Sequence, residues 1–172
     1  SNFSLVVNSR KYSLINLVAF KEDFVCQSNE KKNTPKLLIT RGVSGIGKTA
    51  IAKMIKGYHY FSADDYPDLY PNGKFNPSEL TNAHKWCKKK CLEHFSNGEN
   101  VIIANTHIEL WEMKYWAAFM RSSQLSILQI DYVGDDPEGD IFSTHGVDIS
   151  FIMTKLQRLD QQKLPKELDT SI

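Results

Sequence analysis

The chain has 172 residues, of which 41% are hydrophobic and 24% are charged, and its formal net charge is +1. These values are typical of a globular protein, and the length suffices for one α/β domain with an attached element. The small net charge excludes recruitment to nucleic acid or a membrane by the overall field of the molecule, so nucleic-acid contact requires a local basic patch. Apolar runs such as 14–20 are too short to span a membrane, so no membrane partner is expected.

The three cysteines indicate a reducing compartment, because an odd, small number does not form a disulfide framework. We therefore expect the chain in the cytoplasm or the nucleus. The chain begins at Ser1 rather than Met, which is typical of a fragment, so further domains of a larger protein are expected partners. Cys87 and Cys91 lie four residues apart between His84 and His94, but no C-x-x-C pair accompanies them. Burial as small hydrophobic residues is therefore favoured over a zinc site.

Residues 1–34 are predicted to form an N-terminal appendage. Two apolar stretches, 5–7 and 12–20, flank the polar residues 8–11, a pattern that indicates a β-hairpin. The charged segment 27–33 reads as a linker before Pro35. We expect this element to lie outside the phosphate site.

Residues 35–172 carry alternating strand and helix patterns. Asn76 is suited to cap a helix that begins at Pro77, and Asn97-Gly98 is suited to end it. The predicted strands are 37–40, 58–62, 101–104 and 125–133. The predicted helices are 49–56, 76–97, 109–121 and 149–161, with an exposed acidic loop at 134–139. This alternation predicts an α/β fold of the P-loop NTPase type, with a mainly parallel sheet and helices on both faces.

A complete phosphate-binding motif, G-x-x-x-x-G-K-[ST], lies between the first strand and the first helix of this domain. It consists of Gly42, Val43, Ser44, Gly45, Ile46, Gly47, Lys48 and Thr49. Its glycines allow backbone N–H groups to face phosphate oxygens, and the helix start adds a positive dipole end. Lys48 is predicted to contact the β- and γ-phosphates, and the Thr49 hydroxyl to bind Mg²⁺. A glycine-rich turn arising by chance is disfavoured, because the full motif stands in the correct context.

A pair of carboxylates, Asp64 and Asp65, follows the second strand of the domain. The carboxyl ends of neighbouring parallel strands share one edge of a sheet, so Asp64 is expected to face the phosphate site. A carboxylate there is suited to accept the proton of an attacking hydroxyl group, as the catalytic Asp of kinases does. The alternative is that both carboxylates only cap a helix.

Several further motifs occur in order along the chain: R-G-x-x-G-x-G-K-T at 41–49, S-x-D-D-Y at 62–66, G-K-F-N-P-S at 73–78, A-H-K-W at 83–86, I-I-A-N-T at 102–106, W-E-M at 111–113 and H-G-V at 145–147. Together they resemble the polynucleotide 5′-hydroxyl kinase family of P-loop proteins, and in particular the kinase-like domains of the Nedd4-binding-protein group. The similarity covers about 37–159 and leaves out residues 1–34.

This resemblance implies an ATP- and Mg²⁺-dependent kinase that acts in RNA processing or repair. Asp64 would be the general base that activates a 5′-hydroxyl of RNA or DNA. The acceptor side would be lined by Asp65, Asn105, Thr106 and His107. The sequence departs from the family at three places: Ala104-Asn105 lacks a carboxylate, the lid segment 141–144 lacks an arginine, and Pro67 replaces an arginine of some members.

A missing arginine matters because such a side chain is worth about 10³–10⁵ in rate. Arg121, Lys155 and Arg158 are candidate substitutes, and a partner domain is another source. The basic stretch Lys85, Lys88, Lys89 and Lys90 with Trp86 indicates either a nucleic-acid contact or a solvated helix face. His107 is either an acceptor contact or structural, and Trp111, Tyr115 and Trp116 are predicted to pack in the core.

The sequence therefore favours phosphoryl transfer from ATP or GTP to the 5′-hydroxyl end of RNA or DNA. No guanine-reading N-K-x-D element is present, so ATP is the default donor. Two alternatives remain: a nucleotide- or RNA-binding module with weakened catalysis, and a P-loop kinase for small molecules. The oligomeric state is not indicated.

Overall fold

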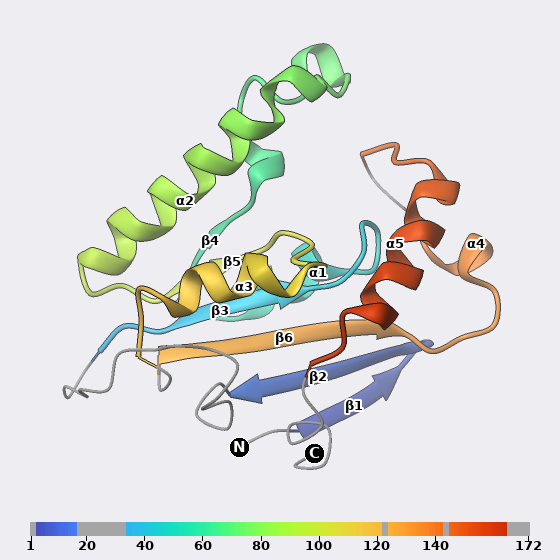
Figure 1. Cartoon of the computed structure of the whole chain (residues 1–172), viewed down its shortest axis with the longest axis horizontal. Coiled ribbons are helices and arrows are strands. Elements are labelled where there is room, and N and C mark those ends of the chain that lie inside the picture. The colour runs from blue at the N-terminus through green and yellow to red at the C-terminus, as the bar shows by residue number, and fades with distance from the viewer. Residues whose placement is uncertain (1–2, 17–33, 122–123, 143–144, 165–172) are drawn as a thin grey trace.

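A six-stranded sheet forms the centre of the structure (Figure 1). The computed structural model describes residues 3–16, 34–121, 124–142 and 145–164. The strand order is β1-β2-β6-β3-β5-β4. The strands are β1 Phe3–Val7, β2 Arg10–Asn16, β3 Leu37–Arg41, β4 His59–Phe61, β5 Val101–Ile103 and β6 Leu125–Tyr132.

The sheet is mixed, which corrects the expectation of a mainly parallel sheet. Strands β6, β3, β5 and β4 are parallel to one another, as the alternation of strands and helices predicted. The N-terminal residues form the predicted hairpin, but β2 also pairs antiparallel with β6 from Arg10↔Tyr132 to Asn16↔Ser126. The hairpin thus extends the parallel sheet instead of standing apart from it. The predicted linker at 27–33 and Cys26 lie outside the described residues.

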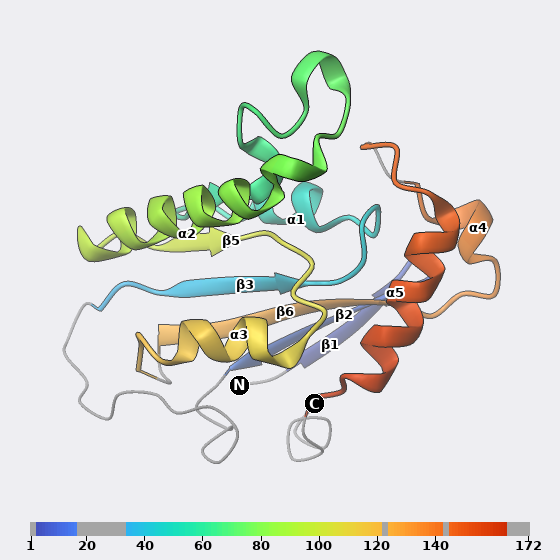
Figure 2. The ribbon, with the colours of Figure 1, turned by 45° about the horizontal axis from the view of Figure 1, so that its top comes forward.

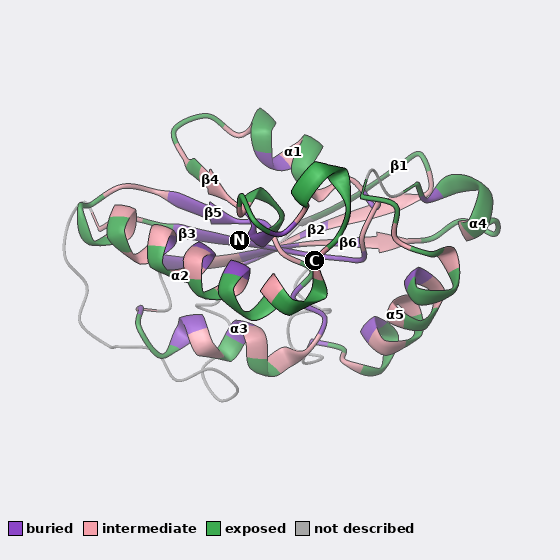
Figure 3. Ribbon diagram, turned by 90° about the horizontal axis from the view of Figure 1, so that it is seen from above, coloured by how far each residue is buried: buried purple, intermediate pink, exposed green. Residues whose placement is uncertain are grey.

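Helices cover both faces of the sheet, as predicted (Figures 2 and 3). Helix α1 packs through Ala52 against Leu38 and Ile102 on one face. On the other face, α2 and α3 pack through Cys87 and Trp116 against the strand residues of the largest core cluster. The helices are α1 Lys48–Met54, α2 Leu80–Ser96, α3 Leu110–Ala117, α4 Pro137–Asp140 and α5 Ile149–Gln161.

The helix boundaries follow the local signals closely. The bounds of α5 match the predicted helix 149–161, and Asp148 caps it by accepting the Ser150 N–H. Asn76 accepts the N–H of Ser78 as predicted, but the first turn, Pro77–Glu79, is 3-10 before α2 begins at Leu80. Part of the predicted loop 134–139 forms the one-turn helix α4, because Asp136 caps it from its side chain. Helix α3 ends earlier than predicted, at Ala117.

Cys87 and Cys91 are both 1% exposed and belong to the core, which confirms that they act as buried small residues. In the described part of the chain, no helix combines the length and apolarity needed to cross a lipid bilayer.

Candidate functional site

Three loops meet at the carboxyl ends of the adjacent strands β3, β5 and β4. The phosphate-binding motif follows β3, Asn105 and Thr106 follow β5, and Asp64 follows β4. Hydrogen bonds connect them in that order. The Gly42 N–H donates to the Thr106 carbonyl at 3.0 Å, and the Ala63 N–H donates to Asn105 Oδ1 at 2.9 Å. The parallel topology therefore gathers the predicted site at one edge of the sheet.

The loop at 42–49 requires glycine at particular positions. A Cβ atom at Gly42 would lie 2.9 Å from the Ile130 carbonyl oxygen, so the close approach to β6 excludes a side chain there. Gly45 and Gly47 have φ values of 81° and 112°, in the left-handed region that glycine adopts without strain. A Cβ at Gly47 would meet nothing within 4 Å, so this side of the loop is open. The buried side chains of Val43 and Ile46 anchor the loop below.

The ammonium of Lys48 lies inside the curve of this loop. Its Nζ donates to the Val43 carbonyl at 2.7 Å. Burial lowers the pKa of Lys48 to about 8, and the charge of the Asp64 carboxylate offsets part of that effect. The Lys48 ammonium is therefore desolvated and lies close to Asp64. A polyphosphate group bound to the loop would stabilise its positive charge.

Oxygen donors suited to Mg²⁺ accompany the loop. Thr49 Oγ1 lies 3.1 Å from the hydroxyl of Tyr60, a residue of β4. Asp65 follows the same strand, and burial raises the pKa of its carboxyl group. A hydroxyl and nearby carboxylates are the ligands that Mg²⁺ takes beside nucleotide phosphates. The donor set therefore fits the predicted ion.

Two aromatic side chains hold Asp64 in place: Tyr70, and His145 of the H-G-V motif, neither of which a sequence signal assigned to the site. The Tyr70 hydroxyl donates to Asp64 Oδ1 at 2.8 Å, and His145 Nε2 lies 3.4 Å from Asp64 Oδ2. The rings of Tyr70 and His145 are stacked, with centroids 4.9 Å apart. Burial, together with the bond to Asp64, raises the pKa of Tyr70, so its hydroxyl stays protonated and donates. The Asp64 side chain is 44% exposed and remains open to an acceptor.

Asn105 braces the turn that carries Asp64. Its Oδ1 accepts the Ala63 N–H, and its Nδ2 lies 3.8 Å from the sulfur of Cys87 on α2. Thr106 is exposed beside the P-loop, to which its carbonyl is bonded. The predicted acceptor residues 105 and 106 therefore lie between the two halves of the site, where Asn105 also supports the backbone.

The geometry favours the structural interpretation of His107. It is 5% exposed, and its Nδ1 donates to the Thr40 carbonyl at 2.8 Å. Burial lowers its pKa to about 4, so the imidazole is neutral. Its carbonyl accepts the Nε–H of Arg41, which is 0% exposed and also donates to the Ile108 and Gln162 carbonyls. Arg41 of β3 thus connects the segment 107–108 and the end of α5 to the strand beneath the site.

Arg10 contacts the P-loop, although the N-terminal appendage was expected to lie outside the phosphate site. Its Nε donates to the Ile46 carbonyl at 3.4 Å, and its Nη2 donates to the Asp140 carbonyl at 2.8 Å. The guanidinium lies 5.9 Å from the centroid of the Tyr132 ring. The pairing of β2 with β6 places it there, and no local sequence signal indicates that pairing.

The three candidate substitutes for a lid arginine lie elsewhere. Arg158 forms a two-pronged ion pair with Glu109 at the start of α3, with N–O distances of 2.6 and 2.7 Å. Lys155 packs over Phe151 on its own helix. Arg121 precedes β6 and so lies toward the opposite edge of the sheet. Residues 143 and 144 of the predicted lid lie outside the described residues.

The basic stretch of α2 borders a groove of about 730 Å³ whose lining includes three lysines and one glutamate: Lys85, Lys88, Lys89 and Glu93, together with Tyr115. Lys88 Nζ lies 4.1 Å from the centroid of Tyr115. A smaller cavity of about 90 Å³ continues from Lys88 toward Asn105, Thr106 and Trp111. Trp111 is 66% exposed, so its predicted core position is wrong, whereas Trp116 is buried as predicted. Trp86 packs on Tyr66 and the core, not outward.

Comparison with known proteins identifies relatives that match more than half of the chain. NEDD4-binding protein 2 of Homo sapiens is 31% identical over an aligned length of 99 residues, and the match covers 54% of this chain and 6% of that protein. A protein of Autographa californica nuclear polyhedrosis virus, named as a bifunctional polynucleotide kinase/RNA ligase, is 27% identical over an aligned length of 137 residues. This match covers 67% of this chain and 20% of that protein. No family model matches the chain.

The resemblance to the polynucleotide kinase family is confirmed. Two solved structures share the fold at 20% identity. A chain in a structure of the Pnkp1/Rnl/Hen1 complex has a TM-score of 0.51 over 66% of this chain and 40% of its own. A chain in a structure of the Pnkp1/Rnl/Hen1 RNA repair complex has a TM-score of 0.57 over 79% and 48%. The chain thus spans only a small part of these curated relatives and less than half of these solved chains.

Proposed function

We propose that this polynucleotide-kinase-like chain transfers the γ-phosphoryl group of ATP to the 5′-hydroxyl end of a nucleic acid. The observation that carries the proposal is the convergence of the Lys48 loop and the Asp64 carboxylate on one edge of the sheet, with Asn105 and Thr106 between them. The name of the viral relative supports a polynucleotide as acceptor.

In this proposal Asp64 accepts the proton of the acceptor hydroxyl as its oxygen bonds to the γ-phosphorus. The bond from that phosphorus to the β–γ bridging oxygen breaks, and the nucleoside diphosphate leaves. Lys48 and the loop amides stabilise charge on the phosphates, and Thr49, with Asp65 nearby, would hold Mg²⁺. When bound, Mg²⁺ would supply further charge neutralisation at the phosphates. Tyr70 and His145 fix the position of the Asp64 carboxylate.

The acceptor strand would follow the basic groove of α2. Lys85, Lys88 and Lys89 provide positive charge for its phosphates, and the exposed ring of Trp111 offers a surface for base stacking. The cavity between this groove and Thr106 is also lined by Asn105, which is bonded to the turn that carries Asp64. A small-molecule kinase would not require this extended basic path, which is why we favour a polynucleotide.

The test is transfer of label from γ-labelled ATP or GTP to 5′-hydroxyl RNA and DNA oligonucleotides, with 5′-phosphorylated oligonucleotides as blanks. We expect Asp64→Asn to lower transfer by about 10²–10⁴ and to leave nucleotide Kd nearly unchanged. Lys48→Ala should weaken nucleotide binding itself. Asp160→Asn, which removes an exposed carboxylate of α5, is the matched control and should transfer like the parent.

The weakened-catalysis alternative is favoured by a specific observation: Arg158, a candidate for the missing arginine, is held by Glu109. Nucleotide and oligonucleotide binding without transfer to any acceptor would support that alternative. Phosphoryl transfer to a small-molecule acceptor that oligonucleotides do not inhibit would support the other alternative, a small-molecule kinase.

A further inference from the structure

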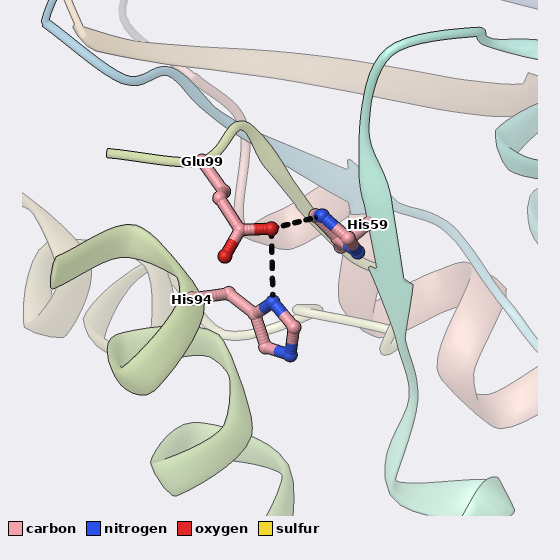
Figure 4. Close-up of side chains that lie close together, drawn as sticks. All are labelled: His59, His94 and Glu99. Atoms are coloured by element: carbon pink, nitrogen blue, oxygen red, sulfur yellow. Dashed lines mark hydrogen bonds and ion pairs between the residues drawn. The ribbon is translucent and has the colours of Figure 1, made fainter. Parts of the chain in front are cut away.

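Two histidines and a glutamate from three different elements lie close together at the end of the sheet that is opposite the phosphate loop (Figure 4). His59 begins β4, His94 lies in the last turn of α2, and Glu99 lies in the connection from α2 to β5. Glu99 Oε2 lies 3.4 Å from His94 Nδ1 and also pairs with His59 Nε2. One donor atom from each residue lies within 4.8 Å of the other two.

These donors suit a transition-metal ion. Imidazole nitrogen and carboxylate oxygen bind Zn²⁺ at about 2.0–2.2 Å, which places neighbouring donors in a tetrahedral site roughly 3.3 Å apart. The separation of 3.4 Å between Glu99 and His94 already has this value. The three side chains are 48%, 31% and 36% exposed, so an ion could enter from solvent and complete its coordination with water.

The backbone holds the three residues in this arrangement. The Glu99 N–H donates to the His94 carbonyl at 3.1 Å, after a turn at Gly98 with φ 80°. The His59 N–H donates to the Asn100 carbonyl at 2.8 Å, next to Glu99 in the chain. The carbonyl end of α2 also favours a cation at this place. Little rearrangement would therefore be needed to bind an ion.

We propose that His59, His94 and Glu99 form a binding site for a divalent transition-metal ion, with Zn²⁺ the preferred ion by donor type. The ion would connect the start of edge strand β4 to the end of α2. Asp64 follows the other end of β4, so this site lies away from the phosphate loop and acts on stability rather than on transfer. It does not depend on the proposed kinase function.

The test is calorimetric titration of the full chain with Zn²⁺ alone at neutral pH, followed by thermal unfolding with and without the ion. We expect one ion per chain and a Tm that rises with Zn²⁺. His59→Ala, His94→Ala and Glu99→Gln should each weaken binding by at least about tenfold and remove the rise in Tm. Glu93→Gln, which removes a neighbouring carboxylate outside the cluster, should bind Zn²⁺ like the parent.

The buried pair Cys87 and Cys91 is the competing place for a soft ion, and Co²⁺ distinguishes the two. Absorption bands of bound Co²⁺ that are typical of nitrogen and oxygen ligands support the proposal, whereas thiolate-to-Co²⁺ charge-transfer bands overturn it. Absence of saturable binding, or an unchanged Kd in the His59→Ala/His94→Ala double variant, also overturns it. Glu99→Gln retains the size and a hydrogen-bonding oxygen of the side chain, so it tests the site even if the histidine variants fold poorly.

Discussion

The Nε2 atom of His145 lies 3.4 Å from the Oδ2 atom of Asp64, although the two residues are far apart in the sequence. Tyr70 donates to the other oxygen of the same carboxylate and stacks on the His145 ring. Asp64 is therefore held from both sides, one of which is contributed by the segment that leads into α5. A carboxylate that must meet an incoming hydroxyl group benefits from such fixed orientation.

The first prediction concerns this orientation. Tyr70→Phe removes the bond to Asp64 Oδ1 while keeping the ring that stacks on His145, so the carboxylate gains rotational freedom. We expect kcat for phosphoryl transfer to fall between about tenfold and 10²-fold, because misplacement of a reacting group has effects of this size. Nucleotide Kd should not change. Tyr58→Phe, which alters a tyrosine at the other end of β4 from Asp64, is the control, and an unchanged kcat in Tyr70→Phe would contradict the assignment.

The second prediction concerns pH and nucleotide binding. Lys48 has a pKa of about 8 in the free protein, and a bound polyphosphate would keep it protonated to higher pH. Below pH 8 the lysine is charged in both forms, so affinity is constant. Above pH 8 binding requires uptake of a proton, and affinity should fall by up to about tenfold per pH unit. Nucleotide titrations between about pH 7 and pH 9.5 measure this.

Lys48→Arg provides the comparison for that experiment, because arginine stays charged throughout this range. Its nucleotide affinity should be lower than that of the parent but should not decline above pH 8. A parent affinity that stays constant to pH 9.5 would show that the Lys48 ammonium does not face the phosphates.

Local patterns were sufficient to predict the central part of the fold. Strands β3 and β5 are buried along their whole length, and buried apolar runs of this kind are typical of parallel strands. The hairpin was also predicted from its own residues. Its partner was not, because β2 pairs with β6 through residues that lie more than a hundred positions away. Alternation within a strand indicates which residues share a face, but not which strand lies beside it.

The same distinction applies to the site. The phosphate loop is a continuous motif, and Asp64 was placed by the rule that parallel strands end at one edge. Tyr70, His145 and Arg10 reach the site through loops or strand pairing, so spacing did not reveal them. The predicted core position of Trp111 was wrong because all the aromatic residues of α3 were assigned to the same, buried face of the helix. Met113, Trp116 and Ala117 form the buried stripe, and Trp111 lies about 200° around the helix from Met113.

The third prediction tests the contribution of the N-terminal hairpin. Arg10→Ala removes the bonds to the carbonyls of Ile46 in the phosphate loop and Asp140 at the end of α4. The loop should lose order, and nucleotide Kd should rise about threefold to tenfold, which corresponds to about 0.7–1.4 kcal/mol. Lys11→Ala is the matched control, because the next residue of a strand points to the opposite face. Equal nucleotide Kd values for Arg10→Ala and the parent would show that the hairpin does not contribute to nucleotide binding through Arg10.

The fourth prediction concerns the buried imidazole beneath the site. His107 has a pKa of about 4 in the folded protein, below the usual unfolded value of about 6.5. The unfolded chain therefore binds a proton more readily, and stability is lost as the pH falls from about 6.5 toward 4. Between pH 7.5 and pH 5 this residue should lower the free energy of unfolding by about 2 kcal/mol.

The variant His107→Asn isolates this contribution from that of the carboxylates. Asparagine tolerates the positive φ of 46° at this position, and its amide can donate to the Thr40 carbonyl but does not gain a proton. Denaturant unfolding of both proteins at the two pH values measures the effect. The variant should lose about 2 kcal/mol less than the parent on acidification. If both proteins lose the same free energy of unfolding on acidification, burial does not lower the pKa of His107 in the folded state.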